Sequence, residues 1–267
     1  MRLSARATVA AAAALTLGVL GLGGARGASA ATAVHWGPAR TATVHPGVTV
    51  TIAGVSCIAG FVFTDGYRAF VAVPGSCAGV DDGKPTDGCK AAQVPYGLKV
   101  TVQGARYKGR VAYSSYTEMQ LRGATGANKC ANNALVLIRL NDRDIKRTNP
   151  SIPSPTGGPT GVATSPATPA QATSYVNGAA TPSELMETTA AGWAHTVYVG
   201  PVFTADQLGS PVLTQAGRAI GMATLVPQLN GGPVTVSNLA KEIAFLQTVR
   251  GFHRVHLARG TLAFHSA

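Results

Sequence analysis

Short apolar runs separated by turn residues follow one another along most of the chain, with the two-residue alternation of strands. A first group of six runs comprises Val48 to Ile52, Phe61 to Phe63, Phe70 to Val73, Lys99 to Val102, Val111 to Tyr113 and Ala134 to Leu140. A second group comprises Trp193 to Val199, Val212 to Leu213, Ala219 to Leu225 and Val234 to Val236. The pattern predicts two β units.

One helix is predicted after the last of these runs. Leu239, Ile243 and Leu246 share a helical face at the spacing i, i+4, i+7, and Ser237 is the expected N-cap. Between the two β groups, residues 149–173 are rich in Pro, Thr, Ser and Gly, which predicts a linker or a long surface loop. The expected architecture is therefore all-β, with two lobes and a C-terminal helix.

The first 30 residues have the pattern of a secretory signal peptide. Arg2 and Arg6 precede an apolar stretch from Ala7 to Leu22, and Ala28 to Ala30 supplies the small residues of a cleavage site. The stretch is shorter than the roughly 20 apolar residues that a membrane span requires. We therefore expect residues 31–267 to be secreted or held in the cell envelope, with no transmembrane segment after cleavage.

Composition changes this picture in one respect, the charge. Only 12% of the 267 residues are charged and 46% are hydrophobic, so a disordered chain is excluded. The net charge of +11 falls to +8 when Arg2, Arg6 and Arg26 are removed with the leader, since no acid leaves with them. The Lys and Arg residues are scattered and no aromatic-rich motif interleaves them, so specific nucleic-acid binding is not expected. Weak association with anionic cell-envelope polymers is a hypothesis.

Four cysteines lie in the first half of the exported part: Cys57, Cys77, Cys89 and Cys130. Their spacing contains no C-x-x-C pair, so neither a zinc site nor any other metal or cofactor site is predicted. In an oxidising compartment they are expected to form disulfides, and four cysteines allow three connectivities.

Several short motifs stand out, among them A-V-P-G-S-C at Ala72 to Cys77, G-W-A-H-T-V-Y at Gly192 to Tyr198 and G-S-P-V-L at Gly209 to Leu213. Together they resemble secreted actinobacterial relatives of the chymotrypsin-fold, or trypsin-like, serine proteases. Ser56 to Phe63, followed by A-V-P-G-S-C at Ala72 to Cys77, is similar to the core of their first barrel. G-W-A-H-T-V-Y at Gly192 to Tyr198 is similar to the approach to their nucleophile, and G-S-P-V-L at Gly209 to Leu213 matches the end of their G-D-S-G-S-P-V-L motif. The resemblance covers most of residues 45–264.

The resemblance implies two six-stranded antiparallel β-barrels and a C-terminal helix. The first barrel would occupy about 45–140, a linker about 141–175, the second barrel and helix about 176–250, and a tail 251–267. It also implies the disulfides Cys57–Cys77 and Cys89–Cys130.

The same resemblance implies that the catalytic side chains are missing. The family cleaves acyl bonds with a serine nucleophile, a histidine that carries the proton and a carboxylate that orients the histidine. The histidine position is Ser76, the nucleophile position is Leu208, and the carboxylate position is Ala134, or Asn133 if the alignment gap moves by one residue. The two oxyanion-hole positions are Asp206 and Leu208, so this site is also expected to be damaged.

No other residue is a good replacement. His195 is expected to have a packing or hydrogen-bonding role, and Ser210 is two residues away from the nucleophile position. We therefore predict a pseudoprotease that binds an unknown protein or peptide through the remnant cleft. An active endopeptidase with a non-standard catalytic arrangement and a basic envelope-adhesion protein are the alternatives.

Overall fold

The computed structural model describes residues 33–80, 87–200, 203–225 and 232–267. The chain divides into two units, and all the described residues belong to the second, Thr32–Ala267. The predicted signal peptide lies outside the described residues. None of the described helices is long and apolar enough to cross a membrane.

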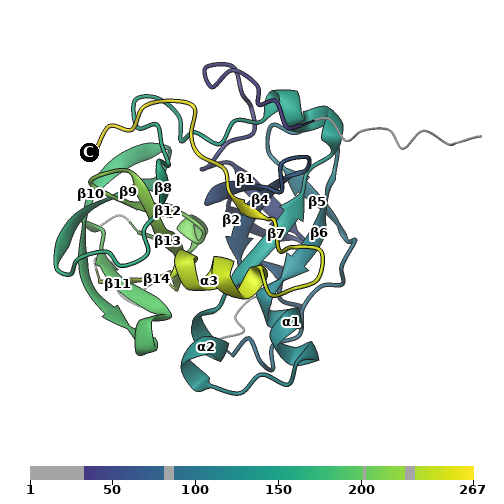
Figure 1. Cartoon of the computed structure of the whole chain (residues 1–267). Helices are drawn as coiled ribbons and strands as arrows, with labels where there is room; N and C mark the ends of the chain where they lie inside the picture. Colours follow the sequence, from purple (N-terminus) through teal and green to yellow (C-terminus); the bar gives the residue numbers. More distant parts are fainter. Residues whose placement is uncertain (1–32, 81–86, 201–202, 226–231) are drawn as a thin grey trace, which may run out of the picture. The chain divides into compact units, whose positions relative to one another are not determined.

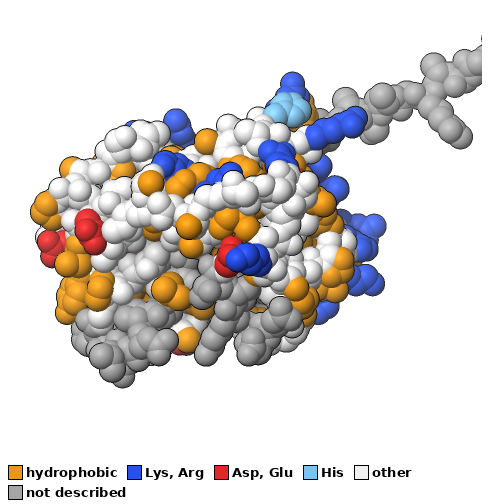
Figure 2. Space-filling view, turned by 90° about the horizontal axis from the view of Figure 1, so that it is seen from below, with side chains coloured by type: hydrophobic (Ala, Val, Ile, Leu, Met, Phe, Trp, Pro, Cys, Tyr) orange, Lys and Arg blue, Asp and Glu red, His pale blue; other side chains and the backbone are white. Residues whose placement is uncertain are grey.

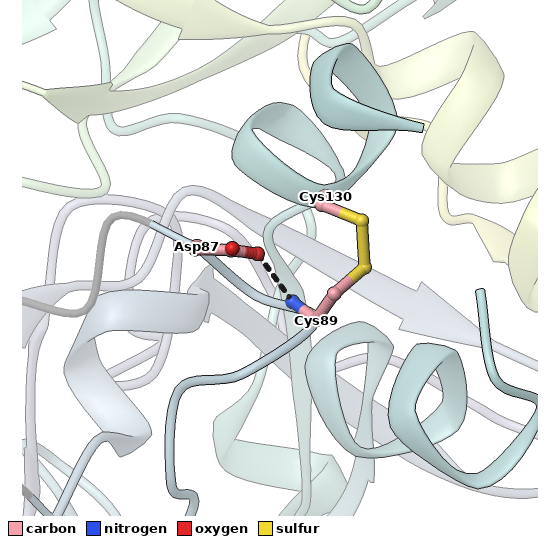
Figure 3. A group of neighbouring side chains, drawn as sticks. All are labelled: Asp87, Cys89 and Cys130. Atoms are coloured by element: carbon pink, nitrogen blue, oxygen red, sulfur yellow. Dashed lines mark hydrogen bonds between the residues drawn. A yellow bond between two sulfur atoms is a disulfide. The ribbon is translucent and has the colours of Figure 1, made fainter. Parts of the chain in front are cut away.

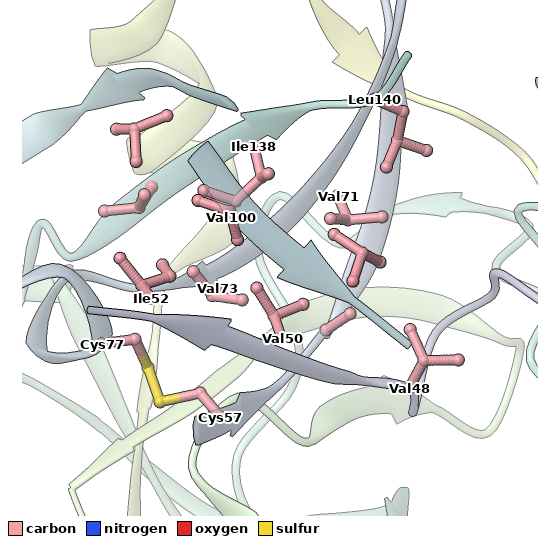
Figure 4. Close-up of a cluster of buried hydrophobic side chains, with 14 of the residues drawn as sticks. Val48, Val50, Ile52, Cys57, Val71, Val73, Cys77, Val100, Ile138 and Leu140 are labelled. Atoms are coloured by element: carbon pink, nitrogen blue, oxygen red, sulfur yellow. A yellow bond between two sulfur atoms is a disulfide. The ribbon is translucent and has the colours of Figure 1, made fainter. Parts of the chain in front are cut away.

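The N-terminal half forms an eight-stranded sheet in the order β15-β3-β4-β7-β6-β5-β1-β2, with antiparallel pairing throughout (Figure 1). Its strands are β1 (Thr49–Ile52), β2 (Val55–Ile58), β3 (Phe61–Thr64), β4 (Ala69–Pro74), β5 (Lys99–Val102), β6 (Gly109–Ser114), β7 (Leu135–Arg139) and β15 (His256–Leu257). Among the described residues no pairing joins the two edges, so this sheet is a half-barrel. Its β-branched side chains, with the Cys57–Cys77 disulfide, fill the interior (Figure 4).

The C-terminal half forms a second sheet in the order β12-β9-β10-β11-β14-β13-β8, and a further pairing of β12 with β13 closes six of its strands into a barrel. The strands are β8 (Gly161–Val162), β9 (Ala170–Val176), β10 (Ala179–Thr189), β11 (Ala194–Tyr198), β12 (Pro211–Thr214), β13 (Arg218–Leu225) and β14 (Val234–Ser237). The predicted all-β class with two antiparallel barrel-like sheets is confirmed. The difference is that only the second barrel is closed.

A shared apolar core joins the two halves. Phe61 and Phe70 of the first sheet belong to the same buried cluster as Leu213 and Met222 of the second. The helix α3 (Leu239–Leu246) packs into this cluster through Leu239 and Leu246. This shared core fixes how the two sheets pack against each other, and a cleft between them requires such a fixed arrangement.

The predicted helix is present, but its cap is one residue later than expected. Asn238, not Ser237, is the N-cap of α3, and its Oδ1 accepts a hydrogen bond from the backbone N–H of Lys241 at 3.1 Å. Ser237 instead ends β14, where its hydroxyl is drawn into a buried contact with Glu242. Because β14 extends as far as Ser237, the cap of the helix is the next residue, Asn238.

Both predicted cysteine pairs are bonded: Cys57 with Cys77, and Cys89 with Cys130. The first links β2 to the turn after β4, and the second links the turn at Cys89 to the helix α2 (Ala127–Asn132). A further helix, α1 (Ser115–Leu121), lies between β6 and α2, and the sequence pattern did not predict either of these short helices.

Five strands were also missed: β2, β8, β9, β10 and β15. β2 is a short hairpin partner of β1, β8 and β15 have two residues each, β10 carries polar residues at most positions, and β9 begins at Ala170, inside the segment predicted as a linker. In β10 only Ser183 and Leu185 are buried, so the sequence lacks a clear apolar alternation there. Pairing with β9 and β11 on its two sides holds β10 in the sheet instead.

Candidate functional site

The three segments that the resemblance aligns with the catalytic triad meet at the junction of the two sheets. Ser76 lies in the 3₁₀ turn Gly75–Ala78 after β4, and the backbone N–H of Gly75 donates to the carbonyl oxygen of Ala134 at 2.6 Å. On the other side, the carbonyl oxygen of Leu208 accepts from the N–H of Ile58 at 2.8 Å. Ile58 adjoins the disulfide to Cys77, so all three segments are held together.

The side chains at these positions include no histidine and no carboxylate. Ser76, Ala134 and Leu208 have no group that is charged or basic near neutral pH. The hydroxyl oxygen of Ser76 is buried and has no hydrogen-bond partner among the described residues. A hydroxyl cannot take up a proton as a histidine does, so this arrangement lacks a general base at the expected place.

Leu208 is fixed by the residue that follows it. Gly209 has φ +99°, and a Cβ there would lie 1.9 Å from the carbonyl oxygen of Ile58 and 3.2 Å from Cδ of Pro74. The backbone of this segment therefore runs against the first sheet at a distance that only glycine permits. The Leu208 side chain is half-buried and packs against the core of the first sheet.

Of the two backbone donors expected to form an oxyanion hole, that of Leu208 is engaged within the chain. Residues Ala205–Gln207 form a 3₁₀ turn, and the N–H of Leu208 donates to the carbonyl oxygen of Ala205 at 3.4 Å. Asp206 is exposed, and its carboxylate accepts from the hydroxyl of Thr204 and from Nε2 of Gln207. These hydrogen bonds, that from Thr204 first, lower the pKa of Asp206. A negative charge therefore stands at this edge of the site, where an oxyanion would need donors.

A small pocket of about 180 Å³ opens beside the same turn. Its lining residues come from both sheets and from the turn itself: Gly47, Ile58, Tyr175, Asn177, Gly178 and Gln207. Gln207 is buried, and its Oε1 accepts from the N–H of Asn177 at 3.0 Å, which ties the β9–β10 turn to the 3₁₀ turn before Leu208. The pocket is smaller than typical ligand cavities, so it suits a single side chain of a longer ligand.

A buried carboxyl group that the sequence analysis did not single out lies directly behind Ala134. Glu242 of α3 is fully buried, and its Oε1 accepts from the backbone N–H of Ala134 at 3.0 Å. Its Oε2 lies 3.0 Å from Oγ of Ser237. Burial raises the pKa of this carboxyl to about 8. Glu242 is therefore mostly protonated at neutral pH and holds the Ala134 segment without a negative charge.

The helical pattern did contain a signal for Glu242. It lies three residues after Leu239 and four before Leu246, so it belongs to the apolar stripe of α3 although it is acidic. A charged residue type on the buried face of a helix predicts a shifted pKa. The stripe alone could not name its partners, which come from β14 and from the segment before β7.

The two candidate replacement residues are both buried. His195 is buried in β11, where its Nδ1 lies 3.1 Å from Oγ1 of Thr188 and burial lowers its pKa to about 4. Ser210 is completely buried, and its hydroxyl has no hydrogen-bond partner among the described residues. Asn133, the alternative carboxylate position, is likewise buried, and its side-chain amide is unpartnered within the same residues.

One further group of acid and sulfur ligands lies at the second disulfide. Asp87, Cys89 and Cys130 come close together, but the two sulfurs are bonded to each other, and Oδ1 of Asp87 accepts from the N–H of Cys89 at 3.0 Å (Figure 3). A disulfide has no thiolate to offer a metal ion. The carboxylate instead caps the turn that carries Cys89.

Solved structures with the same arrangement of sheets identify the architecture. Thermobifida fusca protease A matches 82% of this chain and 100% of its own length, with a TM-score of 0.54 and 14% identity. The chain has the chymotrypsin-like serine protease fold. The Cellulomonas bogoriensis chymotrypsin matches 80% of this chain and 98% of its own, with a TM-score of 0.51 and 15% identity.

The alpha-lytic protease homologue N4 has a TM-score of 0.50 and 15% identity, and it matches 75% of this chain and 95% of its own length. No protein-family model and no curated protein sequence matches the chain. At this level of identity the comparisons establish the chymotrypsin-like fold, which is a hydrolase fold, and the chemistry has to be argued from the site residues.

Proposed function

We propose that this chain is an exported serine-protease homologue without protease activity, which binds an extended peptide segment of a partner protein in the remnant cleft. The observation that carries the proposal is that backbone hydrogen bonds and a disulfide hold together the segments of Ser76, Ala134 and Leu208, the positions that the family resemblance aligns with the catalytic triad. None of the three side chains can act as nucleophile, proton carrier or orienting carboxylate in their expected roles. The N–H of Leu208 is also turned to Ala205, and Asp206 adds a negative charge nearby.

Binding is supported by the features of the cleft that are intact. The pocket of about 180 Å³ lies between the two sheets beside the turn that precedes Leu208. Leu208, which follows Gln207 of the pocket lining, is apolar and half-buried, and this favours a hydrophobic side chain of the ligand. The fixed β9–β10 turn and the shared core keep the cleft formed in the absence of ligand, so little conformational entropy would be lost on binding.

A fluorophosphonate probe tests the loss of activity. The purified protein is expected to show no covalent labelling under conditions in which an active trypsin-like protease is labelled completely, because no serine is paired with a base at this site. Labelling is followed by mass spectrometry of the intact protein. A stoichiometric adduct on one serine would refute the proposal in favour of an active endopeptidase with a non-standard catalytic arrangement.

Substitution in the pocket tests the binding role. The probes are acetylated, fluorescent hexapeptides that differ at one central residue, measured by fluorescence anisotropy. Gly178→Asn is expected to weaken the best of them at least fivefold, since Gly178 lines the pocket with open space above it and Asn tolerates a positive φ. The matched control is Gly54→Asn, at φ +91° with open space and outside the pocket. Equal peptide affinities of the two variants would contradict a cleft-binding function. The function would also be contradicted if none of the peptides bound to the wild type.

A further inference from the structure

The first sheet brings together cations that are scattered in the sequence. Lys99 of β5 is paired directly with Arg110 of β6, and Arg110 is paired directly with Arg139 of β7. All three side chains are exposed, and because they are in register they lie on the same face of the sheet. We call these three residues the cation ladder. Figure 2 shows Lys and Arg side chains gathered on the side of the molecule on which the first sheet lies.

The cation ladder is an unfavourable arrangement by itself. Directly opposed side chains on neighbouring strands have Cβ atoms about 5 Å apart, and like charges at this distance destabilise a sheet. Among the described residues, the acid that forms an ion pair with the ladder is Asp142, whose carboxylate lies 3.3 Å from Nη2 of Arg139. Both partners of this ion pair are substantially exposed, so the pair is weak and compensates only one of the three charges.

The ladder borders a hollow in which an anion can be held. A pocket of about 220 Å³ is lined by Lys108, Arg110, Arg139, Leu140, Asn141 and Asp142. Nη1 of Arg110 donates to the carbonyl oxygen of Gly97 at 3.2 Å, which holds the guanidinium in place and uses one of its five N–H donors. Two guanidinium groups and one ammonium against one carboxylate leave the pocket with a net positive charge.

The chemistry favours phosphate groups that repeat along a chain. Guanidinium groups bind phosphate oxygens through two parallel hydrogen bonds, and ladder steps of about 5 Å match a chain of closely spaced anions better than a single ion. Bases would need a free aromatic surface for stacking. Tyr107, which precedes Lys108 of the pocket, has its ring covered by Arg106 and Arg143, whose guanidinium carbons lie 5.9 and 5.4 Å from its centroid.

We propose that the cation ladder and its adjoining pocket bind a linear phosphate polymer that carries no bases, lying across strands β5, β6 and β7. This site is on the outer face of the first sheet and is independent of the proposed cleft function. Net positive charge alone would attract any polyanion to any basic part of the surface. We expect instead that the three residues of the cation ladder account for most of the affinity for the polymer.

The test measures binding of inorganic polyphosphate to the full chain by isothermal titration calorimetry. Arg110→Gln combined with Arg139→Gln is expected to weaken binding at least tenfold and to reduce its salt dependence, because fewer counterions are released on binding. The matched control, Arg250→Gln with Arg254→Gln, removes the same charge from two exposed positions outside the ladder and is expected to change the affinity less than twofold. Circular dichroism checks that both variants are folded.

Two further probes, polyglutamate and duplex DNA at equal charge concentration, are expected to bind more weakly than polyphosphate. Equal losses in the two double variants would show that the affinity follows net charge, and would overturn the proposal. Tightest binding of DNA or of polyglutamate would also overturn it, in favour of a nucleic-acid or an acidic-protein partner. No binding of polyphosphate by the wild type at low salt would exclude the site altogether.

Discussion

Glu242→Gln is expected to abolish most of the loss of stability that this protein undergoes as the pH rises from about 5 to 9. Glu242 is fully buried, accepts from the backbone of Ala134 and contacts Ser237, and burial raises the pKa of its carboxyl to about 8. An unfolded chain would release the same proton near the ordinary value of about 4.5. Between these two values the folded form holds a proton that the unfolded form has lost.

The sign of the effect follows from this difference. The contribution of Glu242 to stability is complete below about pH 4.5, decreases as the pH rises through the folded-state pKa, and is lost above about pH 8. A difference of about 3.5 pKa units corresponds to roughly 5 kcal/mol of unfolding free energy. Gln reproduces the protonated acid, since its Oε1 accepts from Ala134 and its Nε2 donates to Ser237, and it does not titrate.

Urea unfolding monitored by circular dichroism at pH 5 and at pH 9 measures this effect. The wild type is expected to be less stable than Glu242→Gln at pH 9 by several kcal/mol, and to have about the same stability at pH 5. The control is Glu184→Gln at an exposed position of β10, which is expected to follow the wild type. Parallel losses in wild type and Glu242→Gln would show that Glu242 is not the group that titrates.

Gly209→Ala is expected to destabilise the protein by about 3 kcal/mol or more. The substitution adds strain at φ +99° and brings a Cβ to 1.9 Å from the carbonyl oxygen of Ile58, where backbone rather than a flexible side chain would have to move. The segment that carries Leu208 would be pushed away from the first sheet. We therefore expect both a lower urea midpoint and an altered cleft.

The matched control separates the strain from the clash. Gly54 has nearly the same φ, +91°, with nothing within 4 Å of an added Cβ, so Gly54→Ala is expected to cost only the conformational strain of about 1 to 2 kcal/mol. Equal losses in the two variants would mean that the contact of Gly209 with Ile58 does not hold the Leu208 segment in place.

The fold was predictable where the strands bury apolar runs, either on alternate residues as in β5 or at nearly every residue as in β3 and β4. Lys99–Val102 is a strand with the predicted bounds, and the runs that became β3, β4, β7 and β13 were found to within two residues at each end. β9 and β10 were missed because their residues are mostly small or polar, and it is hydrogen bonding to neighbouring strands that places them in the sheet.

The candidate site was predictable only in part. The positions of Ser76, Ala134 and Leu208 came from local motifs, and the structure brings these segments together through backbone contacts. The role of Glu242 could not be read from the sequence, because a partner 108 residues away supplies its hydrogen bond. The cation ladder could not be predicted for the same reason, because Lys99, Arg110 and Arg139 are far apart in the sequence and only strand pairing brings them together.

The sequence by itself determined the all-β class, the apolar runs that fill the two sheets and the residue types at the candidate catalytic positions, because strand periodicity and motifs are local properties of the chain. The tertiary structure alone decided which groups face one another. It placed Glu242 behind Ala134, pressed Gly209 against Ile58, and aligned Lys99, Arg110 and Arg139 across three strands. Such contacts depend on strand register and on packing between distant segments, and a one-residue slip of a strand would turn every one of its side chains to the opposite face.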